Sequence, residues 1–176
     1  MSGKNLLTDD FKQYAATKLN DSLAQVRKCL SLLTLEQIWH RPNDVSNAIG
    51  NLVLHLNGNI RLWIISSLGG ESFERNRAGE FGQREPIATE QIIDALDVTV
   101  THTADVIQNL TPDQLAARIS IQGYDVSGQA AVFHAVEHFS LHTGQIVYAT
   151  KILTGHDLSL YDANGQRLDG RDASVP

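Results

Sequence analysis

One stretch decides how this chain folds: Phe133-His134-Ala135-Val136-Glu137-His138-Phe139-Ser140-Leu141-His142-Thr143-Gly144-Gln145. Its three histidines stand four residues apart, inside an apolar run without proline from about Ala130 to Leu153, which predicts a helix. Four helical residues advance about 400° and about 6 Å, so neighbouring histidines share one face and can bind one ion. The outer two, His134 and His142, lie about 12 Å apart along the axis and cannot bind the same ion. One metal can therefore take His134 with His138, or His138 with His142, and it needs a third ligand from elsewhere in the chain.

We expect that third ligand on a second long helix, at about residues 47–68. His55 lies within the apolar stripe of this helix, so its imidazole is predicted to face the core. Gly50 and Gly58 interrupt the same helix at a cost of about 1 kcal/mol each relative to alanine. Glycine inside a helix indicates that another helix or a cofactor comes close to the backbone. One imidazole from this helix and two from the histidine helix would meet in a bundle core and leave at least one ligand position open.

An open position on a divalent ion would hold water or substrate, and the ion would lower the pKa of that water or of a thiol. Zinc, nickel, iron and manganese all accept nitrogen ligands, and the sequence does not choose among them. The alternative is a helical bundle whose core histidines bond to the backbone or to Glu137. Glu137 points about 100° away from His138, so we expect it beside the site or on the surface. Gln145, close to the His142 face, would bond to a bound water or substrate, or make a helix–helix contact.

Two more long helices are predicted, which makes the expected fold an all-α helical bundle. The first runs from about Thr8 to Leu33, and the third begins at Thr89 and carries an apolar stripe to Leu110. A long charged connection, Gly70–Pro86, separates the second and third helices. It is either a solvated crossover or the segment that brings Arg75 or Arg77 to the mouth of the site to select an anionic group.

The segments around the histidine helix are shorter. Residues 117–127 lose helical periodicity, which predicts a short β-arm, and Tyr124 on this arm would help to shape the pocket. After a helix stop at Gly155, alternating apolar residues around Asn164-Gly165 predict a small hairpin in the tail. We expect a single domain over residues 1–176, with its core at about 8–155 and a C-terminal tail at 156–176.

Composition excludes several classes of protein. The chain has 176 residues and a net charge of −6, and its basic residues are scattered, which argues against a nucleic-acid surface. No apolar run is long enough to span a bilayer, and the N-terminus lacks the pattern of a signal peptide. The single cysteine, Cys29, excludes an internal disulfide and a thiolate-rich metal site, and it fits a cytoplasmic location.

Two segments together resemble the metal-binding half-motifs of the DinB/YfiT-like superfamily. The second half-motif is similar to His138-Phe-Ser-Leu-His142-Thr-Gly-Gln145, and the first is similar to residues 46–63, with His55 as its single ligand. The stretch Arg75-Asn-Arg77-Ala-Gly-Glu80-Phe81 is similar to one branch of DinB-like proteins without known activity. The similarity covers about Phe11 to Leu153 and does not include the tail.

The resemblance implies an up-down four-helix bundle with a long connection between the second and third helices. It also implies a divalent metal held by His55, His138 and His142, and often a homodimer. His134 would then be a neighbour of the site, with Asn59, Gln145 and Tyr124 in the surrounding pocket. Characterised relatives include thiol-dependent S-transferases and an isomerase that uses a low-molecular-weight thiol. The expected function is therefore that of a metal-dependent hydrolase or thiol S-transferase acting on a small molecule. The alternative is a non-catalytic, metal-binding helical dimer with a stress-response or binding role.

Overall fold

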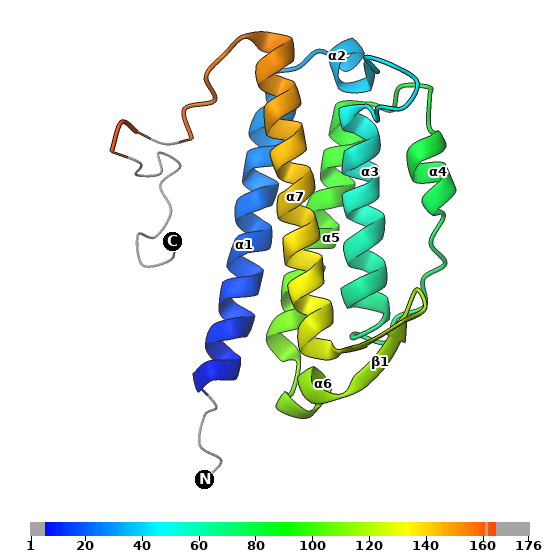
Figure 1. Cartoon of the computed structure of the whole chain (residues 1–176), viewed down its shortest axis with the longest axis vertical. Coiled ribbons are helices and arrows are strands. Elements are labelled where there is room, and N and C mark those ends of the chain that lie inside the picture. Colours follow the sequence, from blue (N-terminus) through cyan, green and yellow to red (C-terminus); the bar gives the residue numbers. More distant parts are fainter. Residues whose placement is uncertain (1–5, 161, 165–176) are drawn as a thin grey trace.

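The computed structural model describes residues 6–160 and 162–164 and contains four long helices packed as a bundle (Figure 1). These are α1 (Leu6–Ser31), α3 (Ile49–Ile60), α5 (Thr89–Asn109) and α7 (Gly128–Thr154). Helix α1 packs against α5 and α7, and α3 packs against the same two helices from the other side. The predicted four-helix bundle is confirmed.

The connection after α3 returns the chain along the whole length of the bundle. At its end, Ile87 accepts a hydrogen bond from the indole of Trp39, beside the start of α3. At the start of this connection, Gly69 lies against Val106 near the end of α5. Helices α3 and α5 therefore run in the same direction, with α1 and α7 opposed to them (Figure 1).

Short elements close the two ends of the bundle. Helix α2 (Leu35–Trp39) and helix α6 (Pro112–Ala116) both begin with capping boxes, at Thr34 and Thr111. The predicted β-arm is a two-stranded antiparallel hairpin of β1 (Arg118–Ile121) and β2 (Tyr124–Ser127), which leads directly into α7. Helix α7 ends at Gly155, whose positive φ of 67° suits glycine.

Two details differ from the sequence-based expectation. The long connection is not entirely irregular, because it contains α4 (Arg77–Gly82), capped by the side chain of Asn76. Helix α3 continues as a π-helix, η1 (Arg61–Ser66), in which Ser67 donates its N–H to the carbonyl of Leu62. The described residues beyond Gly155 contain no strand, and the rest of the predicted tail hairpin lies outside the described residues.

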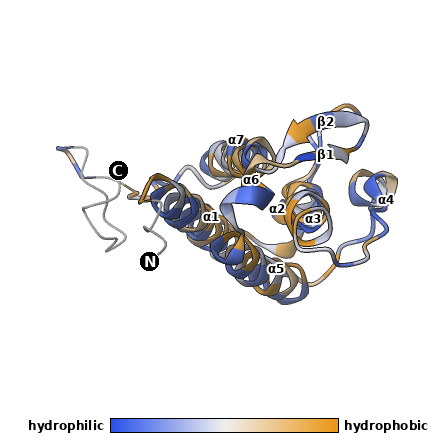
Figure 2. Ribbon diagram, turned by 90° about the horizontal axis from the view of Figure 1, so that it is seen from below, coloured by the Kyte–Doolittle hydropathy of each residue, from blue (hydrophilic) through white to orange (hydrophobic). Residues whose placement is uncertain are grey.

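The core lies between the long helices, whose hydrophobic sides turn toward one another (Figure 2). Its largest fully buried side chains are Phe139, Leu19, Ile38, Leu56, Ile60, Ile64, Leu96 and Ile107. Cys29 is completely buried among them, as expected for a small core residue. Helix α4 lies beside α3, and the β-hairpin lies beside the start of α7 and contributes Ile121 to the core.

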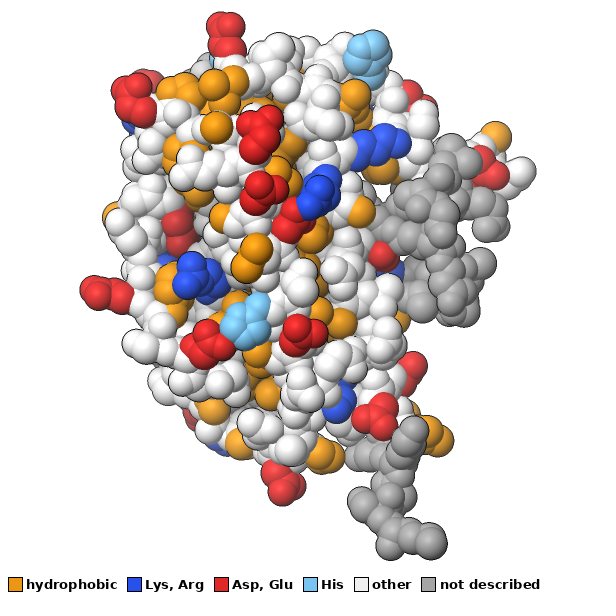
Figure 3. Space-filling view, turned by 180° about the vertical axis from the view of Figure 1, so that it is seen from behind, with side chains coloured by type: hydrophobic (Ala, Val, Ile, Leu, Met, Phe, Trp, Pro, Cys, Tyr) orange, Lys and Arg blue, Asp and Glu red, His pale blue; other side chains and the backbone are white. Residues whose placement is uncertain are grey.

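Charge is mixed on the surface. On the face turned away in Figure 1, acidic and basic side chains are interspersed without a basic patch (Figure 3). Among the described helices, none is long and apolar enough to cross a membrane.

Candidate metal centre

Three histidines from two antiparallel helices meet inside the bundle. His55 comes from α3, and His138 and His142 come from successive turns of α7. One ring nitrogen of each lies within 4.8 Å of those of the other two. The rings of His55 and His138 approach to 4.9 Å between centroids, those of His55 and His142 to 5.0 Å, and those of His138 and His142 to 4.5 Å.

The donor geometry fits a divalent cation. The Nε2 atoms of His55 and His138 are 3.1 Å apart. In a tetrahedral zinc site with metal–nitrogen bonds of about 2.0–2.1 Å, two ligand nitrogens lie about 3.3 Å apart. Two imidazole lone pairs at this distance need a proton or a cation between them. Three nitrogens in this arrangement could hold one ion and leave a coordination position free.

A buried carboxylate supports His55. Its Nδ1–H donates to Oε2 of Glu80 at 2.8 Å, which fixes the tautomer and leaves Nε2 free to bind a metal. Glu80 also accepts hydrogen bonds from Arg75, from Nε at 2.7 Å and from Nη2 at 2.8 Å. All three side chains are less than one tenth exposed. The ring of Phe81 covers the imidazole at 4.5 Å.

Two residues of α3 hold Glu80 in place: Gly58 leaves space for its carboxylate, and the buried amide of Asn51 bonds to the backbone of α4. Gly58 lies one turn from His55 on α3, and a Cβ there would overlap Oε1 of Glu80. Asn51, fully buried on the same helix, donates its side-chain amide to the carbonyls of Glu80 and Gln83. Sequence reasoning missed the role of Glu80, and the helix-interior glycine was the signal that could have revealed it.

The α7 side of the cluster has weaker support. Nδ1 of His142 bonds to Oε1 of Gln145 at 2.7 Å, and Gln145 is exposed. Gln145 therefore contacts the candidate ligand itself. Nδ1 of His138 is buried and has no hydrogen-bond partner among the described residues. Glu137 is exposed, as expected for a residue that points away from His138.

Burial and charge keep the α7 histidines neutral. Burial, reinforced by the neighbouring His142, His55, His134 and Arg75, lowers the pKa of His138 to about 3. Burial also lowers the pKa of His142, which its bond to Gln145 partly opposes. For Glu80, burial disfavours ionisation, but hydrogen bonds from His55 and Arg75 outweigh it and lower the carboxyl pKa. The result is an ionised Glu80 and neutral His138 and His142, the protonation states that metal binding requires.

A pocket of about 430 Å³ opens beside His55 and His138. The remaining predicted residues line it: His134, Asn59 and Tyr124, together with Arg75, Arg77 and Trp63. The ring of His134 stacks on Trp63 at 4.0 Å and lies 5.5 Å from that of His138. Asn59 is buried, and its Oδ1 has no hydrogen-bond partner among the described residues. Arg75 is less available than expected, because Glu80 already binds its guanidinium.

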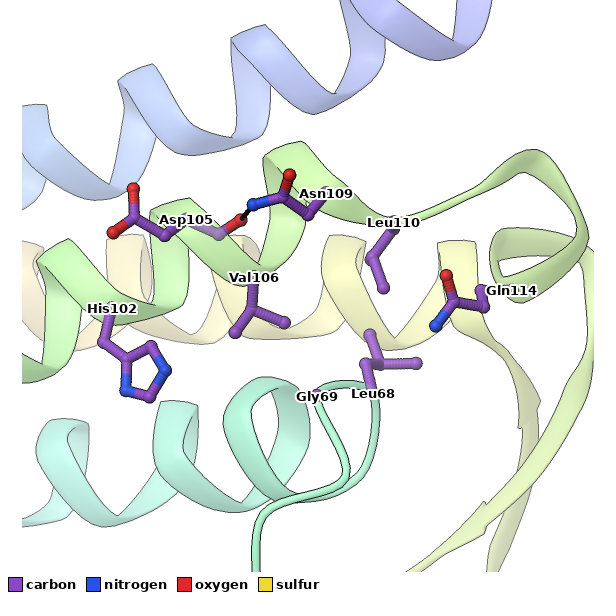
Figure 4. Close-up of a pocket in the computed structure, with 8 residues that line it drawn as sticks. All are labelled: Leu68, Gly69, His102, Asp105, Val106, Asn109, Leu110 and Gln114. Atoms are coloured by element: carbon purple, nitrogen blue, oxygen red, sulfur yellow. Dashed lines mark hydrogen bonds between the residues drawn. The ribbon is translucent and has the colours of Figure 1, made fainter.

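Other cavities lie apart from the candidate ligands. One, of about 480 Å³, lies on the far side of Gln145 and is lined mainly by apolar residues, including Leu52, Tyr148 and Ile152. Another lies between α5 and the segment after η1, where His102 and Asp105 reach its edge (Figure 4). His102 is partly covered and pairs with Glu71 at 2.9 Å.

Sequence comparison assigns the family. A sequence model of the family described as "Protein of unknown function (DUF1572)" matches residues 7–163. The chain belongs to this family. None of the curated proteins matches the sequence.

Three solved structures share the fold. A conserved protein from Enterococcus faecalis superposes with a TM-score of 0.67 at 16% identity, covering 82% of this chain and 97% of its own. A DinB-like protein from Bacillus subtilis superposes with a TM-score of 0.62 at 18% identity, covering 90% of this chain and 99% of its own. A DinB-like protein from Bacillus cereus superposes with a TM-score of 0.59 at 18% identity, covering 78% of this chain and 88% of its own. These matches and the family assignment confirm the expected DinB-like fold.

Proposed function

We propose that this DUF1572 protein is a divalent-metal-dependent enzyme that acts on a small molecule, as a hydrolase or a thiol S-transferase. The observation that carries the proposal is the convergence of His55, His138 and His142, of which His55 and His138 line an open pocket. These three side chains would hold zinc, nickel, iron or manganese. A metal in such a site supplies a Lewis acid, which lowers the pKa of a water or a low-molecular-weight thiol.

The pocket residues would prepare the reactants. Asn59 would accept one hydrogen bond that positions the substrate, because its amide oxygen otherwise lacks a partner among the described residues. His134 would accept a proton, since burial lowers its pKa and keeps the imidazole neutral, although Glu137 partly opposes this shift. Tyr124, 63% exposed on the β-hairpin, would cover the bound substrate.

A non-catalytic metal-binding dimer is the second candidate, and the outer face of α7 favours the dimer. Four large apolar side chains there are more than half exposed: Phe133, Leu141, Tyr148 and Ile152. At about 100° per residue they fall within one side of the helix. A second copy of the chain would cover this stripe. The single, buried cysteine favours a cytoplasmic location for such a dimer.

The metal is tested first. We expect elemental analysis to find about one divalent ion per chain in the wild-type protein. His138→Ala should lose more than the roughly 10- to 100-fold in affinity that removal of a supporting hydrogen bond costs. The exposed His156 lies beyond α7, so His156→Ala should keep the metal. Equal metal contents in the two variants would remove His138 from the ligand set.

Activity separates the two candidates. Metal-loaded protein is incubated with bacillithiol, mycothiol or glutathione and a generic electrophile, and separately with a generic ester. Turnover that is lost in His138→Ala supports the enzyme. A protein that keeps its metal, runs as a dimer by size-exclusion chromatography with light scattering, and turns over none of these compounds supports the non-catalytic candidate.

A further inference from the structure

The pocket beside the three histidines is cationic, although the whole chain carries a net charge of −6. Two arginines, Arg75 and Arg77, line it, and none of its described lining residues is acidic. His55, His134 and His138 also line the pocket. Its permanent positive charges are therefore those of the two arginines.

The two arginines differ in how their charge is balanced. The guanidinium of Arg75 is buried and pairs with Glu80, so its charge is neutralised within the protein. Arg77, exposed at the first turn of α4, stacks over the ring of Phe81 at 4.9 Å. Among residues 6–160 and 162–164, no carboxylate forms an ion pair with Arg77. Arg77 is thus a cation in the pocket whose fork of donors is free for a ligand.

The rest of the pocket is aromatic. Trp63 packs between His134 and Tyr124, with ring centroids at 4.0 Å and 6.4 Å. Tyr124 leaves 63% of its surface exposed on the β-hairpin. Such rings bind apolar or planar groups. The pocket therefore combines an anion-binding group, an aromatic wall and the edge of the histidine cluster.

We propose that this pocket selects small molecules that carry a carboxylate group together with an apolar or aromatic group. The guanidinium of Arg77 binds the carboxylate in a bidentate pair, and Trp63 and Tyr124 contact the apolar part. This inference deepens the proposed function, on which it rests, by naming the substrate class of the same site. Arg77 is a binding residue here and takes no part in proton transfer.

The test compares an acid with its neutral analogue. 4-Phenylbutyrate and 4-phenylbutanamide are titrated into metal-free and zinc-loaded protein by isothermal titration calorimetry. We expect the acid to bind about tenfold more tightly than the amide, because only the acid forms a charge-assisted, bidentate pair with the guanidinium. This preference should decrease as ionic strength rises.

Arginine variants locate the source of the preference. Arg77→Gln should reduce the ratio of the two affinities to near one, and Arg77→Lys should keep part of it. Arg61 is the matched control, since it also stacks over a phenylalanine, Phe73 at 4.5 Å, but does not line this pocket. Arg61→Gln should keep the full preference, and circular dichroism checks that each variant is folded.

Two results would overturn the inference. The first is equal binding of acid and amide by the wild-type protein. The second is a preference that Arg77→Gln leaves unchanged, including one seen only with zinc, which would mean that the acid binds the metal. A wild-type protein that binds no metal refutes the proposed function, yet the arginine-dependent preference is still measurable in that protein. The two failures are therefore distinguishable.

Discussion

The α3 side and the α7 side of the histidine cluster are supported in different ways. His55 on α3 is 4% exposed and bonds to Glu80, a carboxylate that Arg75 also binds from the crossover connection. His142 on α7 is half-buried and bonds to Gln145, an exposed residue three positions along the same helix. His138 has no such support, since its Nδ1 lacks a partner among the described residues.

The α3 and α7 halves of the site therefore depend on different parts of the fold. The α7 half needs only its own helix, because histidines and glutamine at spacings of three and four residues are already neighbours. The α3 half needs a segment that returns along the bundle and places Glu80 and Arg75 beside His55. Damage to that segment should affect both stability and metal binding, whereas damage on α7 should stay local.

The largest effect is expected from Glu80→Ala. This change leaves the guanidinium of Arg75 buried without its counter-ion, which costs about 3–5 kcal/mol of the free energy of unfolding. Loss of the bond to His55 should also weaken metal binding by about 10- to 100-fold. Urea denaturation and competition with a chromogenic chelator measure the two effects. Glu85→Ala, an exposed glutamate of the same connection, should change neither, and equal behaviour of the two variants would contradict the support assigned to Glu80.

Two glycine substitutions test the same contrast. A Cβ at Gly58 overlaps the carboxylate of Glu80, so Gly58→Ala should destabilise the protein by about 2 kcal/mol and weaken metal binding. Gly144 on α7 has open space around it, so Gly144→Ala should stabilise the protein by up to about 1 kcal/mol. Thermal unfolding and metal titration compare the two. Stabilisation by Gly58→Ala would show that Glu80 can move without consequence.

Acid should destabilise the metal-free protein through the α7 histidines. The folded state does not protonate His138 until about pH 3, whereas the unfolded chain does so below about pH 6.5. Between these values the unfolded state binds more protons, so the free energy of unfolding falls as pH falls, by up to about 1.4 kcal/mol per pH unit. Urea denaturation at pH 7 and pH 5 with a chelator measures this slope. His138→Gln should reduce it, and an unchanged slope would assign the effect to other groups.

The smallest effect is expected from Gln145→Ala. Its contact with His142 is exposed and local, so removal should weaken metal binding only about threefold, or less than about 1 kcal/mol. Stability should remain near that of the wild-type protein. Gln129→Ala, an exposed glutamine at the start of the same helix, is the control. If Gln145→Ala lost as much metal affinity as Glu80→Ala, the proposed difference between the α3 and α7 sides of the cluster would be wrong.

The sequence by itself determined the helices and the one-sided placement of the histidines. Helical periodicity and stop signals depend on neighbours a few residues apart, so the sequence predicts the long helices and the stop at Gly155. The same local geometry showed that one ion cannot take both His134 and His142. It left open which of them joins His138, and only the family resemblance favoured His142.

Tertiary structure places His142, and not His134, in the cluster, because this placement depends on which ring faces another helix. His55 meets His138 and His142 across the bundle, while His134 stacks on Trp63 in the pocket wall. The partnership of Glu80 with His55 was also invisible in the sequence, since 25 residues separate them and only the path of the crossover brings them together. Gly58 marked a close approach, but the identity of the approaching group required the fold.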